Sequence, residues 1–131
     1  MKVECNRIVI SEDDLGLEIE FNENELVEDP ESLDYNNITE VANSIGPYVL
    51  IRRSYPEDEF ETDYYYIESN RFDNSGELKK FTLILDKRDL KIKWPNNLVE
   101  IELKVVEKDI RALKKALEIF TQIDGELKIN Y

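Results

Sequence analysis

Carboxylates are the most abundant reactive groups in this chain, with 30 aspartate and glutamate residues among 131. Two of them could act as acid and base in a glycosidase, and several together could hold Mg²⁺ or Ca²⁺. Accidental pairs are unavoidable among so many acids, and neither acidic stretch has the Asp-x-Asp-x-Asp-Gly spacing of an EF-hand loop. A carboxylate-dependent hydrolase is therefore a less favoured interpretation, and we predict no catalytic residue.

Most other catalytic and metal-binding chemistry lacks the residues that it needs. The chain has no histidine, which removes Ser-His and Cys-His pairs, imidazole bases and most zinc sites. Cys5, the only cysteine, alternates with Val3 in a β-rich segment, which is typical of a core residue. The four glycines lie far apart, so they cannot assemble a phosphate-binding loop. We therefore expect neither a cofactor nor a bound metal.

The charged residues are distributed unevenly along the chain. Between Arg7 and Arg52 there are twelve acidic residues and no lysine or arginine, and a second acidic cluster follows at 57–63. Residues 1–76 hold five basic and twenty acidic residues, whereas residues 77–131 hold twelve and ten. Such a one-sided field repels nucleic acid and anionic membranes and attracts a basic protein. A basic protein partner is the favoured interpretation; the bland alternative is charge that only keeps the protein dispersed.

Two acidic segments, residues 23–34 and 57–63, are the predicted partner-binding regions. Their carboxylates would supply long-range attraction, whereas buried aromatic side chains carry more binding energy than charges at an interface rim. Phe60 is therefore the predicted anchor, and its alternative role is a loop residue that packs onto the core. The candidate partner-binding residues are Glu28, Asp29, Glu31, Glu57, Asp58, Glu59, Phe60, Glu61 and Asp63.

The acidic segments must be positioned by a β-rich scaffold. Apolar and polar residues alternate in several segments, as expected for strands with one wet face. We expect one mainly antiparallel sheet that contains residues 17–21, 81–85, 90–94 and 101–105. Further strands are predicted at residues 3–10, 48–53, 64–67 and 127–131.

Two helices are expected beside these strands. Residues 108–121 have the clearest helical pattern, and this helix should pack on one face of the sheet through Ile110, Leu113, Leu117 and Phe120. A short helix is predicted near residues 37–45, where apolar residues recur at helical spacing before Gly46-Pro47. The order of strands followed by a late helix indicates an α+β fold, and the length indicates a single domain of residues 1–131.

The composition favours a cytoplasmic location. A lone cysteine excludes an internal disulfide and is typical of a reducing compartment. The first seven residues include the charged Lys2, Glu4 and Arg7, in a region where a signal peptide would be apolar. The longest purely apolar run, residues 48–51, is far too short to span a membrane.

A series of motifs begins with the strand Tyr48-Val49-Leu50-Ile51-Arg52-Arg53 and an acidic loop. It continues with the aromatic strand Tyr64-Tyr65-Tyr66-Ile67-Glu68, a turn at Gly76, a hairpin at 80–94 and the late helix. This series resembles the immunity protein 10 family of bacterial polymorphic toxin systems, over roughly residues 48–121. The chain differs from the family pattern at Arg52, where glutamine is usual, and at Ser75-Gly76-Glu77, where paired glycines are usual. Residues 22–46 look like an insertion.

The resemblance implies a cytosolic immunity protein that has no chemistry of its own and neutralises a cognate toxin by tight binding. The acid excess agrees with it, because many toxins that act on nucleic acid present basic clefts. Three other functions stay open. A DNA mimic that inhibits a nucleic-acid-binding protein would need a regular line of carboxylates. A hydrolase would need a deep pocket with two convergent acids, and a structural scaffold would need neither.

Overall fold

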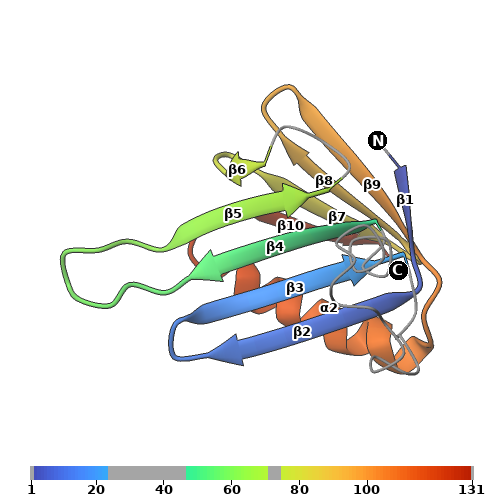
Figure 1. Cartoon of the computed structure of the whole chain (residues 1–131), viewed down its shortest axis with the longest axis horizontal. Helices are drawn as coiled ribbons and strands as arrows, with labels where there is room; N and C mark the ends of the chain where they lie inside the picture. Colours follow the sequence, from blue (N-terminus) through green and yellow to red (C-terminus); the bar gives the residue numbers. More distant parts are fainter. Residues whose placement is uncertain (1, 24–46, 71–74, 131) are drawn as a thin grey trace, which may run out of the picture.

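The computed structural model describes residues 2–23, 47–70 and 75–130, and these form two five-stranded sheets and one helix (Figure 1). One sheet, which we call the meander sheet, is antiparallel throughout. Its strands in spatial order are β2 (Arg7–Asp13), β3 (Gly16–Asn22), β4 (Tyr48–Ser54), β5 (Tyr64–Ser69) and β6 (Gly76–Glu77). The helix α2 spans Glu107–Phe120. The expected α+β class is thus confirmed.

The other sheet, which we call the mixed sheet, combines antiparallel and parallel pairs. Its strands in spatial order are β1 (Lys2–Cys5), β9 (Asn97–Leu103), β8 (Asp89–Trp94), β7 (Thr82–Asp86) and β10 (Glu126–Asn130). The two edge strands are the parallel ones, since β1 pairs with β9 and β10 pairs with β7. Strands β9 and β10 are not neighbours, but they run in the same direction. Consecutive strands of this kind need a long crossover connection, and α2 provides it.

The prediction of one sheet is wrong in two respects. The alternating segment 17–21 lies in the meander sheet, whereas 81–85, 90–94 and 101–105 lie in the mixed sheet. The predicted strand 3–10 is divided at Asn6, so that β1 and β2 belong to different sheets. Alternation shows which face of a strand is buried, but it does not show which strand lies beside it.

Both sheets and the helix contribute to one core. Three alternate residues of β3, Leu17, Ile19 and Phe21, are fully buried, and each pairs across the meander sheet with a buried residue of β4. We call this core-lining side of each sheet its inner face. Cys5 is buried in the same core, as predicted.

Helix α2 buries the residues that its spacing predicted. Ile110, Leu113, Leu117 and Phe120 are all buried, together with Ala116. The helix contacts β2 and β3, and in Figure 1 it runs behind these two strands. The sequence pattern therefore identified the apolar stripe correctly. The predicted helix near 37–45 lies outside the described residues.

An aromatic cluster closes the core near the C-terminal end of α2. Tyr65 of β5, Phe81 before β7 and Phe120 of α2 have ring centroids 5.0–5.7 Å apart. Gly125 lies against this cluster with a φ of +83°, and a Cβ atom there would collide with the Phe81 ring. The chain can therefore turn from α2 into β10 only with glycine at this position.

No helix within the described residues has both the length and the apolar character needed to cross a membrane.

Candidate protein-interaction surface

The second acidic segment forms a loop that projects from one end of the meander sheet. Residues 55–63 join β4 to β5, and in Figure 1 this connection extends well beyond the ends of the neighbouring strands. Two other connections meet at its base, the β2–β3 turn at 13–16 and the α2–β10 connection at 121–125. We call these three connections together the acidic tip.

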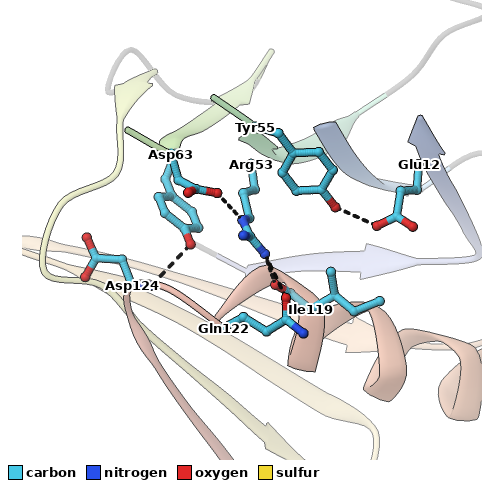
Figure 2. Close-up of polar contacts among 8 residues, drawn as sticks. Glu12, Arg53, Tyr55, Asp63, Ile119, Gln122 and Asp124 are labelled. Atoms are coloured by element: carbon cyan, nitrogen blue, oxygen red, sulfur yellow. Dashed lines mark hydrogen bonds and ion pairs between the residues drawn. The ribbon is translucent and has the colours of Figure 1, made fainter. Parts of the chain in front are cut away.

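Arg53 and Asp63 anchor the two ends of the β4–β5 loop to each other. The Arg53 Nε donates to the Asp63 carboxylate at 2.6 Å, and the two side chains are only 8% and 11% exposed (Figure 2). Both groups are therefore largely withdrawn from solvent, where an ion pair depends on good geometry. Asp63 was predicted to bind a partner, but its carboxylate is already used inside the protein.

Arg53 also joins the loop to the C-terminal end of α2. Its guanidinium donates to the Ile119 carbonyl and to the Gln122 side-chain oxygen, the latter at 3.3 Å (Figure 2). The last turn of α2 contains no basic residue. A cation at a helix C-terminus is favourable because the last carbonyls are unpaired and carry partial negative charge. Arg53 thus supplies from β4 the positive charge that the last turn of the helix lacks.

Tyr55 connects the loop to the β2–β3 turn. Its backbone N–H donates to the Leu15 carbonyl at 2.9 Å. Its hydroxyl donates to the Glu12 carboxylate at 2.6 Å (Figure 2). Burial and the hydrogen bond to Glu12 raise the pKa of Tyr55 to about 12. The Arg53 guanidinium lies 4.9 Å from the centre of the Tyr55 ring. The base of the loop is therefore held from both sides.

Hydrogen bonds within the loop fix the shape of its outer part. One Asp58 carboxylate oxygen accepts from the backbone N–H groups of Phe60 and Glu61, at 2.8 and 3.1 Å. The Glu61 carboxylate accepts from the Glu57 N–H at 3.1 Å. Aspartate side chains commonly hold turns in this way. Asp58 and Glu61 therefore shape the loop, in addition to any effect of their charge on a partner.

Phe60 lies within this loop, and its side chain is 88% exposed. The alternative that it packs onto the core is therefore wrong. Leaving a phenyl ring in water forgoes roughly 1.5–3 kcal/mol of burial free energy. Glu57 and Glu59 are also exposed beside it. An exposed aromatic surrounded by carboxylates has the composition of an interface anchor with a polar rim.

Two apolar residues of the acidic tip were missed in the sequence. Leu15 of the β2–β3 turn is 55% exposed, and Ile123 of the α2–β10 connection is 67% exposed. The available signal was an apolar residue at a turn, next to Gly16 in one case and just before Asp124-Gly125 in the other. The Asp13 carboxylate accepts from the N–H of Leu15 at 2.8 Å, which fixes the turn. The tip therefore combines acidic and apolar side chains.

The remaining predicted partner-binding residues, Glu28, Asp29 and Glu31, lie outside the described residues. Within residues 2–23, 47–70 and 75–130, no group of three acidic or cysteine side chains is arranged to hold a metal ion.

A cavity of about 310 Å³ lies on the outer face of the mixed sheet, away from the acidic tip. Its lining includes Asp86, Asp89 and Glu100, together with Lys2 and Lys91. Asp86 and Asp89 are exposed to solvent, and Glu100 lies 4.0 Å from the Lys91 amine. Two of the three carboxylates are thus exposed and the third lies beside a lysine, whereas the hydrolase alternative would need two convergent acids in a deep pocket.

No protein-family model matches the chain, and neither a curated protein nor a solved structure is significantly similar to it. The resemblance to the immunity protein 10 family therefore stays a prediction.

Proposed function

We propose that this protein is an immunity protein that binds a basic toxin domain through the acidic tip and blocks its active cleft. The exposed ring of Phe60 is the observation that carries the proposal. It stands on a loop whose shape and base are fixed by hydrogen bonds and a buried ion pair. A preorganised anchor loses little conformational freedom on binding, which favours affinity. The protein needs no catalytic group for this function.

The carboxylates of the tip would act mainly before contact. The chain has a formal net charge of −13, and the exposed Glu57 and Glu59 flank the anchor. Such a field steers a basic partner and raises association rates by roughly 10- to 1,000-fold, an effect that salt screens. Phe60 would act after contact, because a desolvated anchor slows dissociation.

The test measures binding kinetics with the cognate toxin domain over a series of salt concentrations, and the gene immediately upstream is the first place to look for that domain. Glu57→Gln with Glu59→Gln should slow association and flatten its salt dependence, while dissociation changes little. These two carboxylates are chosen because the hydrogen bonds that shape the loop use Asp58 and Glu61 instead. Phe60→Ala should speed dissociation by about 30-fold or more, since interface anchors contribute at least about 2 kcal/mol and each 1.4 kcal/mol is about tenfold.

The matched control is Asp86→Asn with Asp109→Asn, which removes the same charge from exposed positions away from the tip. Association of this control should stay close to that of the unmodified protein. If the control and the tip variant slow association equally, only net charge matters and the tip is not the binding surface. If Phe60→Ala leaves dissociation unchanged, Phe60 is not the anchor.

DNA mimicry is the second candidate, because one row of the mixed sheet carries a line of carboxylates. The line crosses four neighbouring strands, and its members pair directly with one another in the order Glu4, Glu102, Asp89 and Asp86. Neighbouring strands lie about 4.8 Å apart. The line is interrupted, however, since Glu4 pairs with Lys104 at 3.2 Å. A mimic would lose binding in Asp86→Asn with Asp89→Asn and keep it in the Phe60→Ala variant.

A further inference from the structure

Four strands form the edges of the two sheets, and one of them differs from the others. Two edges are short, since β1 has four residues and β6 has two, and in β10 the charged Glu126 and Lys128 alternate with Leu127 and Ile129. Short and charged edges are the usual protection against pairing with another chain. The fourth edge, β2, has seven residues; its charges lie toward the two ends, at Arg7, Glu12 and Asp13, and the uncharged stretch between them is residues 8–11. Within the described part of the chain it pairs with β3 only.

The residues of β2 are complementary to a second copy of the same strand. In an antiparallel pair of two β2 strands, all seven residues find partners only when Ile10 lies opposite Ile10 of the other copy. This register places Arg7 opposite Asp13, Ile8 opposite Glu12 and Val9 opposite Ser11. Opposite charges in direct cross-strand positions stabilise a pair of strands. The two-fold symmetry produces two such Arg7–Asp13 pairs.

The exposed side chains of β2 are those that such pairing would cover. Ile8 and Ile10 lie on the inner face, because they pair with the buried Phe21 and Ile19 of β3. Ile10 is nevertheless 36% exposed. A second β2 would place another Ile10 beside it on this face, with Glu12 of each copy opposite Ile8 of the other. The pairing would therefore cover the exposed Ile10.

We propose that two copies of this chain pair through β2 and form a continuous sheet across a two-fold axis. Because the two β2 strands would run in opposite directions, and the acidic tip lies at the end where β2 meets the β2–β3 turn, the two tips would point to opposite ends. Their like charges would then be well separated. This inference does not depend on the proposed toxin binding, and of the acidic tip the pairing would use only Asp13, so the β4–β5 loop with Phe60 would stay free in both copies.

The first test measures molar mass by light scattering or sedimentation over a range of protein concentrations. The unmodified protein should reach twice the 15.5 kDa of one chain. Ile10→Lys places two cations on the symmetry axis and should leave the protein monomeric, with a circular dichroism spectrum that shows an intact fold. A protein that stays monomeric up to about 200 µM would overturn the proposal, since a dissociation constant weaker than that corresponds to less than about 5 kcal/mol of binding.

A charge exchange makes the test specific for the register. Arg7→Asp and Asp13→Arg should each weaken the dimer about tenfold or more, because each replaces two attractive pairs with two repulsive ones. An equimolar mixture of the two variants should recover the dimer, since every Arg7–Asp13 position again joins opposite charges. A dimer that neither variant weakens, or a mixture that stays monomeric, would contradict the proposed register.

Two further variants separate the loss of the dimer from a loss of folding and test the contact directly. Asp13 also accepts from the N–H groups of Leu15 and Gly16, so Asp13→Asn keeps an acceptor for the turn while removing the charge. It should weaken the dimer without loss of stability. Ile10→Cys should form a disulfide-linked dimer on mild oxidation, because Cys5 is buried and cannot compete. Glu126→Cys on β10 is the control and should stay uncrosslinked; the opposite pattern would place the contact at another edge.

Discussion

Replacing Arg53 with methionine should break the contacts that join the two ends of the β4–β5 loop to each other and to the C-terminal end of α2. Methionine keeps much of the length and apolar volume of the arginine stem but removes every donor. The Asp63 carboxylate would then be left with little solvent and without its cation, and the Ile119 carbonyl would keep only its longer hydrogen bond, from the Gln122 N–H at 3.3 Å. Removing one member of a buried pair typically costs about 3–5 kcal/mol, because the other charge is left uncompensated.

This loss is large relative to the total stability of a small domain, which is about 5–15 kcal/mol. Asp63→Asn should cost less, about 1–2 kcal/mol, because Arg53 keeps the helix carbonyl, Gln122 and the Tyr55 ring. The double variant should be no less stable than Arg53→Met alone, since it no longer contains an unpaired buried carboxylate. Coupling of this kind would identify the ion pair as the source of the effect.

Urea unfolding followed by circular dichroism measures these free energies. The matched control is Arg52→Met, one position earlier on the opposite face of β4, where the guanidinium is less buried and donates to Ser54 at 3.2 Å. It should cost less than about 1 kcal/mol. If Arg53→Met and Arg52→Met destabilise the protein equally, the buried pair does not hold the loop and the helix together.

Two further predictions concern the core and the loop base. Leu117→Ala should lower the free energy of unfolding by about 2–5 kcal/mol, because Leu117 is fully buried, and a loss below about 1 kcal/mol in urea unfolding would contradict the packing of α2. Since the pKa of Tyr55 is raised from its ordinary 10.0 to about 12, the contribution of this phenol to stability is complete below about pH 10 and disappears toward pH 12. The decline in unfolding free energy over this pH range should therefore be smaller in Tyr55→Phe, and an equal decline in both proteins would refute the assignment.

The sequence by itself determined the local features of this protein. Alternation identified the strands and their buried faces, because successive side chains of a strand point to opposite sides. Helical spacing identified the buried stripe of α2, including Leu117. The run of charged residues around Phe60 predicted a loop, because these residues do not pack into a core. Each of these features depends only on residues that are near one another in the chain.

Only the tertiary structure decided which elements lie side by side. Alternation is equally strong in β3 and β8, yet the two strands belong to different sheets. No pattern marked Arg53 as the residue that reaches a helix carbonyl 66 positions later, or Asp63 as its internal partner. The acidic tip, with Leu15 and Ile123 beside the loop, likewise depends on three connections that meet only in the folded chain. A period in the sequence specifies a face, whereas neighbours across a sheet and buried ion pairs are set by packing between distant segments.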